Sequence, residues 1–418
     1  MMILYPSNAG TYTKAAAALL QDDLNAAFGT DIQLVALGEN ADISAYTHAI
    51  VIGRVGSEAC AISDALTEGS YRMKIEASAD YRAYLVGKND YDTLRAVQEF
   101  YSRAVKYGKV AFPPCMDITA GLLYNTRDPA VLKYGDKYYL YQAYGGSYAV
   151  RESSDLLNWT SPKVIFTKPT GFDGVDNFWA PECHYYDGAF YLFATYRSGS
   201  TGYRGTTILR CDTPNGQFKQ WSNGFITPKD RDSIDGTLYV DAGGTPWMVY
   251  VDEWTNYNRD ANGVADANGT NPGAMRYVQL SDDLKSTVGS YSDAMFWAND
   301  PSWTDVKVTD GPYLYRCKGG TLLMIWSNGS ASGYSVGIAR SDNGELDGNW
   351  EQLDERLFTG DNANIYRIAP GGHGMIFEGP GGRLYLSVHT PNSGTGQAPL
   401  FIPIVERNEM LYLDTVNL

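Results

Sequence analysis

The sequence predicts two domains of different classes: a small α/β sandwich over residues 1–112 and an all-β domain, a five-bladed β-propeller, over residues 118–418. Two observations lead to this division. Up to residue 112, stretches with apolar residues at helical spacing alternate with strand-length apolar runs. After Pro113-Pro114, which cannot continue a helix, short runs of Tyr, Val, Leu and Phe alternate with turns rich in Gly, Asn, Asp and Ser.

The first domain contains two predicted helices and four predicted strands. The helices cover residues 13–28 and 91–105, where apolar residues recur at helical spacing. The strands are short apolar or alternating runs at 32–35, 49–53, 71–75 and 81–86. Because strands alternate with helices, we expect a small sheet that is covered by helices.

One supersecondary unit recurs five times in the second domain. Each copy has a polar anchor, a short strand, a turn containing glycine and a strand rich in aromatic residues. The anchors are Asp128-Pro129, Ala180-Pro181-Glu182, Asp235-Gly236, Asp310-Gly311 and Gly372-His373. The turn glycines are 53, 55, 76 and 62 residues apart, enough for four antiparallel strands per unit: Gly135, Gly188, Gly243, Gly319 and Gly381. Third strands are expected at 207–210, 275–278 and 335–339. Five such units closed into a ring form a five-bladed propeller without exposed sheet edges.

The anchors are expected to meet in space, because the innermost strands of a propeller line its channel and start at one mouth. Glu253 and Trp254, at the end of a second strand, should reach the same face. Clustered carboxylates repel one another, which raises the pKa of at least one of them. A protonated acid beside an ionised one is the pair that hydrolysis of a glycosidic bond needs, and aromatic rings offer flat faces to sugars. Four anchors carry an acid and the fifth a histidine: Asp128, Glu182, Asp235, Asp310 and His373.

At these positions the sequence resembles glycoside hydrolase family 43, whose enzymes are five-bladed propellers. The resemblance covers residues 118–418 and rests on five motifs, one per blade, at 126–131, 178–182, 234–239, 309–314 and 371–377. It implies that Asp128 is the general base and that Asp235 tunes the pKa of the proton donor. Asp310 stands where the family has a glutamate as donor, and its carboxyl reaches about 1.5 Å less far. The donor therefore stays open between Asp310, Glu253 and Glu182.

The resemblance also implies roles for side chains around the acids. His373 matches a channel histidine that often faces a hydrated calcium or sodium ion on the propeller axis. A structural ion of this kind is one expectation for His373, with no ion required for the chemistry, and a hydrogen-bonded core histidine is the other. Four further side chains are expected to bind substrate: Trp179, Trp254, Tyr313 and His184. His389, near the end of a second strand, is expected to face the same pocket.

The function that the resemblance suggests is an exo-acting, inverting glycoside hydrolase. It would remove terminal furanose residues from oligosaccharides or polysaccharide side chains, most simply as an α-L-arabinofuranosidase. A β-D-galactofuranosidase and a β-xylosidase are alternatives, because one pocket residue can admit or reject a hydroxymethyl group. Two other classes stay open: a carbohydrate-binding propeller without catalysis, which would lack a correctly placed donor, and an interaction scaffold that uses the blade rims.

The first domain carries a resemblance of its own. Residues 71–75, 84–90 and 93–97 resemble the α/β domain that precedes the catalytic domain in glycoside hydrolase families 20 and 67. That domain is non-catalytic, which implies a packing or substrate-flanking role here. Gly87-Lys88 lacks the other residues of a phosphate-binding loop and is interpreted as a turn.

Composition limits the partners. Lys and Arg number 33 against 48 Asp and Glu, and the net charge of −15 argues against nucleic acid or an anionic membrane as the main partner. No apolar run is long enough to span a membrane and no signal peptide is visible, so we expect a cytoplasmic protein. The five cysteines are scattered without a Cys-X-X-Cys motif, and we expect them to be reduced thiols.

Overall fold

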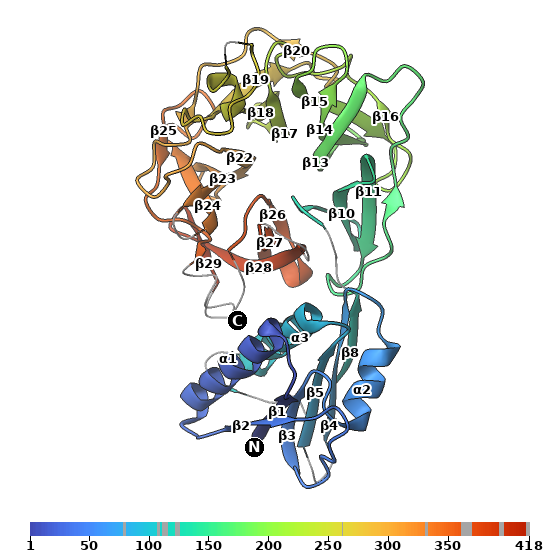
Figure 1. Ribbon diagram of the computed structural model, residues 1–418. Helices are drawn as coiled ribbons and strands as arrows, with labels where there is room; N and C mark the ends of the chain where they lie inside the picture. Colours follow the sequence, from blue (N-terminus) through green and yellow to red (C-terminus); the bar gives the residue numbers. More distant parts are fainter. Residues whose placement is uncertain are drawn as a thin grey trace.

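The computed structural model describes residues 1–77, 81–106, 109–110, 116–121, 126–260, 262–330, 333–360, 370–392 and 397–414. The chain forms an N-terminal α/β domain, at the bottom of Figure 1, and a ring of five sheets above it. The ring confirms the predicted five-bladed β-propeller. Within the described residues, no helix is long and apolar enough to cross a membrane.

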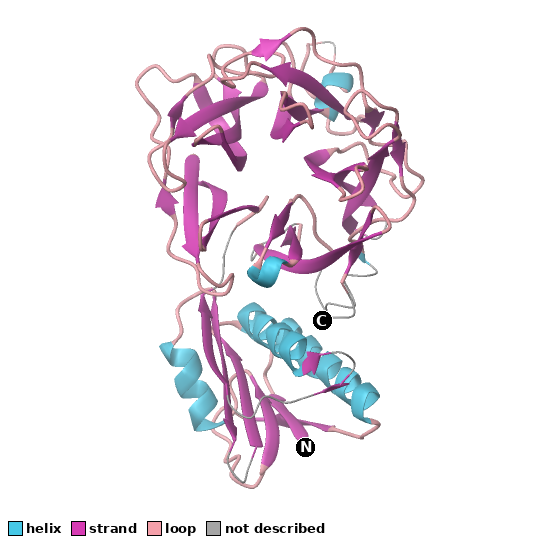
Figure 2. Ribbon diagram, turned by 180° about the vertical axis from the view of Figure 1, so that it is seen from behind, coloured by secondary structure: helices cyan, strands magenta, loops and turns pink. Residues whose placement is uncertain are grey.

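The N-terminal domain is built on a six-stranded sheet with the order β2-β1-β3-β5-β4-β8. Helices α1 (Thr11–Phe28) and α3 (Asp90–Ala104) cover one face and α2 (Gly56–Ala65) covers the other, as Figure 2 shows from behind. A two-stranded hairpin, β6 (Val105–Lys106) and β7 (Lys109–Val110), follows α3. The strands of the sheet are β1 (Met2–Pro6), β2 (Gln33–Leu37), β3 (His48–Ile52), β4 (Ser70–Ala77), β5 (Tyr81–Gly87) and β8 (Met116–Gly121).

The helices pack where their apolar residues predict. Ala16, Leu20 and Leu24 of α1 recur every four residues and are buried against the sheet. The helix ends at Gly29, whose φ of 63° suits a residue without a side chain. At its start, the amides of Tyr12 and Thr13 each donate to the Asp90 carboxylate over 2.9 Å, which satisfies two open N–H groups and ties α1 to α3.

Five elements of this domain were not predicted: β1, α2, β6, β7 and β8. Helix α2 buries little more than Ala59 and Ile62 of its apolar residues, so its helical pattern is weak. Strand β8 pairs antiparallel with β4. The first sheet therefore extends to residue 121, past the predicted end of the domain at residue 112, and the propeller follows it.

Each blade is a four-stranded antiparallel sheet whose strands follow one another in the chain. The predicted third strands are confirmed as β15, β19 and β24, and β21 (Phe296–Trp297) adds a fifth strand to blade 3. Short 3₁₀ helices lie at Trp254–Tyr257 and Pro380–Gly382. The blade strands, in order, are β9 (Ala130–Tyr134), β10 (Lys137–Tyr144), β11 (Ser147–Ser153), β12 (Lys163–Val164); β13 (Gly174–Tyr186), β14 (Ala189–Ser198), β15 (Arg204–Cys211), β16 (Lys219–Gln220); β17 (Ser233–Val240), β18 (Pro246–Asp252), β19 (Ala274–Leu280), β20 (Thr287–Val288); β22 (Asp310–Arg316), β23 (Leu322–Ser330), β24 (Gly333–Ser341), β25 (Trp350–Gln352); and β26 (Ile376–Glu378), β27 (Leu384–Thr390), β28 (Ala398–Arg407), β29 (Met410–Leu413).

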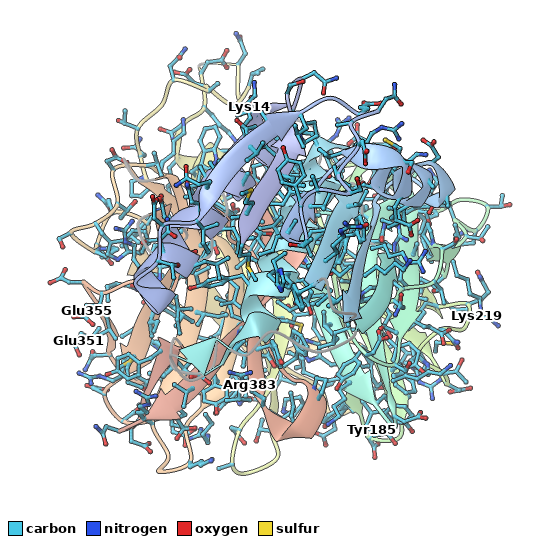
Figure 3. All side chains as sticks on the ribbon, turned by 90° about the horizontal axis from the view of Figure 1, so that it is seen from below. Lys14, Tyr185, Lys219, Glu351, Glu355 and Arg383 are labelled. Atoms are coloured by element: carbon cyan, nitrogen blue, oxygen red, sulfur yellow. The ribbon has the colours of Figure 1, made fainter. Side chains whose placement is uncertain are left out.

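The surface of the blades is charged. Seen from below (Figure 3), the N-terminal domain lies in front of the ring, and side chains such as Glu351, Glu355 and Lys219 point outward from the blades. The cysteines Cys60, Cys183, Cys211 and Cys317 are free thiols, and Cys115 lies outside the described residues.

Candidate active site

The inner strands of all five blades begin with the same backbone irregularity. At this point each blade has a residue with a positive φ: Asp128 (50°), Ala180 (38°), Asp235 (54°), Gly311 (50°) and His373 (48°). In blades 2, 3 and 4 the register of strand pairing also shifts here, as at a β-bulge. The left-handed backbone costs a residue with a side chain roughly 1–2 kcal/mol. Strain of this kind gathers at functional sites, which marks this mouth of the channel.

A comparison of the five blades shows which of the predicted anchors occupy equivalent positions. Asp128, Asp235 and His373 occupy equivalent positions in their blades. Asp310 lies one residue before the equivalent position of blade 4, and Glu182 lies two residues after that of blade 2. The four acids are therefore staggered along the inner strands. A pocket in the channel is lined by residues from four blades: Asp128, Pro129, Ala130, Ala180, Pro181, Glu182, Gly311, His373, Gly374 and Met375.

Asp128 faces two histidines from blade 5. Its Oδ1 lies 3.3 Å from Nδ1 of His373 and 3.3 Å from Nδ1 of His389. Burial alone would raise the pKa of Asp128, but the positive charges around the carboxyl, that of His373 first, outweigh burial and hold the pKa below 3.8. Asp128 is therefore ionised at neutral pH.

The two histidines differ in charge. The Asp128 amide donates to Nδ1 of His389 over 3.2 Å, so this nitrogen carries no proton, and Nε2 lies 3.1 Å from Oδ1 of Asn392, to which it donates. Burial lowers the pKa of His389 to about 4, in agreement with a neutral ring. Burial also disfavours a charge on His373, but the surrounding carboxylates, Asp128 first, outweigh it and raise its pKa. His373 is the cation among the acids.

Asp235 is the most enclosed of the anchor acids, with 5% of its side chain exposed. Its Oδ2 accepts a hydrogen bond from the Gly311 amide over 3.2 Å and lies 3.8 Å from Nδ1 of His373. Burial, together with repulsion from Asp310 and Asp128, raises the pKa of Asp235 to about 7.

Asp310 accepts a hydrogen bond from a tyrosine of its own blade. The Tyr334 hydroxyl, on β24, donates to Oδ2 over 2.8 Å. Burial of Asp310 and the charge of Asp128 raise its pKa, while His373 and the Tyr334 hydrogen bond oppose that rise. Asp310 therefore holds its proton at higher pH than an ordinary aspartate.

Glu253 lies at the end of β18 in a buried ion pair. Its Oε2 is 2.6 Å from Nη2 of Arg204 and accepts the Thr255 hydroxyl over 3.3 Å. Nη2 of Arg204 also lies 3.4 Å from Asp232. Burial raises the pKa of Glu253 to about 8, and the charges of Asp232, Asp310 and Asp235 add to the rise against the opposing charge of Arg204. Glu253 thus belongs to the same electrostatic cluster as the anchor acids.

Glu182 is held by polar side chains of blades 2 and 3. The Thr237 hydroxyl donates to Oε1, and Nε2 of His184 lies 2.6 Å from the same oxygen. The ring of His184 packs edge-on against Phe193, with centroids 5.6 Å apart. His184 is thus held between blades 2 and 3 by Glu182, rather than presented alone to a substrate.

The predicted aromatic residues differ in exposure. Trp179 is 37% exposed and stacks with the Arg204 guanidinium, 5.4 Å from the ring centroid. The Trp254 ring is covered on one face by the Lys307 amine, 3.7 Å from its centroid. Tyr313 packs half-buried against the core between blades 4 and 5, and burial raises its pKa. Of these three predicted aromatic residues, only Trp179 is exposed.

The residues do not fit an ion bound directly by His373. Nδ1 of His373 points at two carboxylates and carries the proton that their charge favours, so it has no lone pair for a metal. Over the part of the chain that the structure describes, no group of three or more His, Cys, Asp or Glu side chains could hold a metal ion. The ion on the propeller axis stays a prediction.

The structure brings the predicted acids together and adds residues that no motif marks. Tyr334 and Arg204 lie at the starts of third strands, where nothing in the sequence distinguishes them from other blade residues. Arg127 directly precedes the first anchor, and His389 ends a second strand as Asp252 and Glu253 do in blade 3. The place of His389 at the end of a second strand was the signal that predicted it to face the pocket, and it lies against Asp128.

The chain is similar to one family model and to several solved structures. The model of the glycosyl hydrolases family 43 matches residues 122–402. An endo-arabinase structure from Bacteroides thetaiotaomicron VPI-5482 is 34% identical with a TM-score of 0.59, over 68% of this chain and 95% of that chain. A family-43 glycoside hydrolase described as thermostable, 22% identical with a TM-score of 0.57 over 70% and 93% of the two chains, shares the fold.

Curated relatives share shorter regions. "Alpha-L-arabinofuranosidase 43" of Humicola insolens is 24% identical over 270 residues, which is 62% of this chain and 53% of that protein. An extracellular endo-α-(1→5)-L-arabinanase of Bacillus subtilis is 29% identical over 145 residues, 31% of this chain and 43% of that protein. The chain thus spans about half the length of the curated relatives it matches. The family model covers most of the chain and extends from blade 1 into blade 5, and the chain belongs to the glycosyl hydrolases family 43.

Proposed function

We propose that the protein hydrolyses α-L-arabinofuranosyl bonds with inversion at the anomeric carbon, and that it removes terminal residues. One observation carries the chemistry: around one channel mouth, Asp128 has a lowered pKa while Asp235, Asp310 and Glu253 have raised ones. Carboxyl groups whose pKa values differ in this way supply an ionised base and a protonated donor at the same pH.

Asp128 acts as the base. Its ionised carboxylate takes a proton from a water molecule, and the oxygen of that water attacks the anomeric carbon from the face opposite the leaving group. The cation His373 keeps Asp128 ionised, and the neutral His389 fixes its backbone through the Asp128 amide. A general base must be ionised to accept a proton, and the lowered pKa of Asp128 agrees with this requirement.

Asp310 acts as the donor and gives its proton to the glycosidic oxygen as the bond breaks. Tyr334 holds Oδ2, which leaves Oδ1 for the proton. Glu253 is less suited, because its ion pair with Arg204 favours the ionised form and opposes release of Glu253 from its buried partners. Asp235 interacts electrostatically with both Asp128 and Asp310, and its carboxyl is held by the Gly311 amide, next to Asp310.

Substrates with different leaving groups distinguish the two donor candidates, Asp310 and Glu253. Asp310→Asn should lower kcat on an unactivated arabinoside by about 10²–10⁴-fold and should spare a 4-nitrophenyl arabinoside, whose leaving group needs no proton. Glu253→Gln is the matched control. It removes the acidic proton of the second donor candidate and keeps a side-chain carbonyl oxygen facing Arg204. Equal losses on both substrates for Asp310→Asn, or a selective loss for Glu253→Gln, would assign the donor elsewhere.

The connection that begins at Glu253 supports action on terminal sugars. The long connection between β18 and β19 begins at Glu253 and is held by Lys307, whose amine donates to the carbonyls of Ala267 and Gly269 over 2.6 Å each. The same amine lies over Trp254. A clamped loop at one side of the acids leaves less room for a chain that continues past the cleaved bond.

An endo-acting arabinanase is the second candidate. The observation that favours it is the name of the 34% identical structure, an endo-arabinase. Linear α-1,5-arabinan and the aryl glycosides of α-L-arabinofuranose, β-D-galactofuranose and β-D-xylopyranose distinguish the candidates. Exo action releases arabinose alone from the first minutes and turns over the aryl arabinofuranoside. Oligosaccharides as the first products would establish endo action, and turnover of only another glycoside would refute the sugar assignment.

A further inference from the structure

The propeller closes at a weak seam between its first and last blades. Each of the five sheets consists of strands consecutive in the chain, so no strand is exchanged between blades 1 and 5 within the described residues. The apolar cluster at this seam, as far as the structure describes it, has four buried residues, against 11 to 15 in each cluster between other blades. Less apolar burial means less hydrophobic stabilisation of the closed ring. The four are Val131, Tyr138, Leu140 and Phe377.

The candidate base lies on this seam. Three consecutive residues, 126–128, each bond to blade 5 or to the connection between β27 and β28. The Thr126 amide donates to the Gln397 carbonyl over 3.1 Å. The Arg127 guanidinium donates to the carbonyl oxygen of Asn392 over 2.9 Å and to its Oδ1 over 3.2 Å. The next amide, that of Asp128, donates to His389.

The N-terminal domain contacts both sides of the seam. On blade 1, Leu157 packs against the core that α1 and α3 form with their sheet. On blade 5, the Tyr91 hydroxyl of α3 donates to the Thr390 carbonyl over 3.2 Å, and Nη2 of Arg95 donates to the Pro399 carbonyl over 2.8 Å. Arg95 is 7% exposed, so its hydrogen bond is made away from water. Figure 1 shows α3 directly below β28, with β8 leading up toward blade 1.

The two sets of contacts meet in one short segment. Thr390, which accepts from Tyr91, directly follows His389 and comes two residues before Asn392. His389 and Asn392 are the residues that hold the Asp128 amide and the Arg127 guanidinium. The hydrogen bond from Arg95 to the Pro399 carbonyl holds the beginning of strand β28. A displacement of α3 is therefore transmitted to the base through two or three residues.

We propose that the N-terminal α/β domain is a clasp that holds blades 1 and 5 together and thereby positions Asp128. Tyr91 and Arg95 are positioning residues for the base, 30 residues or more away from it in sequence and in another domain. The clasp takes the place of a strand exchanged between blades 1 and 5, which the described part of the ring does not contain. The part of this proposal that concerns the base rests on the proposed function, whereas the part that concerns the seam does not.

A pair of double variants of the full-length protein tests the clasp. Tyr91→Phe/Arg95→Met removes the two hydrogen bonds to blade 5 and keeps most of the side-chain volume. Tyr12→Phe/Arg82→Met is the matched control: Tyr12 packs on Tyr91 at 5.2 Å, and Arg82 donates only to carbonyls at residues 43–46 of its own domain. If the clasp variant does not fold, the single variant Tyr91→Phe, which lacks one oxygen atom, replaces it.

Two readouts follow, one of which needs no substrate. Amide hydrogen exchange in peptides 126–131 and 384–392 should speed up about tenfold or more in the clasp variant and stay as in the wild type in the control, because the seam opens locally. With the preferred arabinoside, kcat should fall about 10- to 100-fold with KM within twofold, since the base is misplaced and binding is not. Sodium azide, which attacks without giving up a proton, should restore turnover in the clasp variant and not raise that of the control.

The results decide as follows. Exchange in the seam peptides equal to that of the control would overturn the clasp. Faster exchange with unchanged kcat, or a loss of kcat that azide does not relieve, would overturn the positioning of the base. If the wild type hydrolyses none of the glycosides, the proposed function fails, and the exchange comparison alone decides whether the N-terminal domain closes the ring.

Discussion

Removing the Tyr334 hydroxyl should move the alkaline limb of the pH–rate profile upward. That hydroxyl donates to Oδ2 of Asp310 over 2.8 Å, and it stabilises the ionised carboxylate more than the protonated one. A hydrogen bond to a charged group contributes about 1.5–3 kcal/mol. Since one pKa unit corresponds to about 1.4 kcal/mol, Tyr334→Phe should raise the pKa of Asp310 by about 1–2 units. The donor then stays protonated, and the enzyme stays active, at higher pH.

The assay is kcat/KM for the preferred unactivated arabinoside from pH 4 to 10, because its limbs report the ionisations of the free enzyme. Tyr315→Phe is the matched control. Tyr315 lies in the same blade and its hydroxyl donates to a carboxylate, that of Glu406, over the same 2.8 Å, but away from the anchors. The control should leave both limbs in place. An alkaline limb that stays fixed or moves to lower pH in Tyr334→Phe would show that Asp310 is not the donor.

Three further predictions follow. Asp128→Asn should lower kcat at least 10³-fold on activated and unactivated arabinosides alike, because both need the base; steady-state rates near those of the wild type would refute that role. The raised pKa of Glu253 favours its protonated form in the folded protein, so its contribution to stability is present below pH 4.5 and is lost as the pH rises through about 8. Glu253→Gln should therefore flatten the fall of Tm between pH 5 and pH 9, and parallel Tm curves for the two proteins would contradict this. Dialysis against EDTA should leave kcat within twofold, because His373 already supplies the positive charge among the acids; activity that is lost and then restored by calcium would contradict it.

The blade repeat explains how much of the fold could be predicted. Turn glycines and aromatic strands recur wherever a blade needs a hairpin, so five blades and three of their third strands could be predicted. Helix α2 was not, because short helices with small buried residues such as Ala59 leave a weak apolar pattern. Strand β8 was missed because it pairs with β4, about 45 residues earlier, and carries no turn signal of its own.

The anchors could be predicted as neighbours, but their order along the channel could not. A β-bulge inserts a residue without changing the motif, and the offset of Asp310 by one position from Gly311 depends on that backbone geometry. Partners that set the pKa values come from third strands and from the last blade. Tyr334 is an ordinary strand residue in sequence, and the place of His389 at the end of a second strand predicts only that it faces the pocket. The closed ring brings these two residues to Asp310 and Asp128.

Proton NMR of the first-formed sugar tests the central claim most directly. With an α-L-arabinofuranoside, attack by a water molecule that Asp128 activates, opposite a donor at Asp310, must give the β-anomer before mutarotation. We expect the β-anomer signal to rise first in wild-type reactions. An α-anomer formed first would require a covalent intermediate and a nucleophilic carboxylate, and it would contradict the assignment of Asp128 as a base.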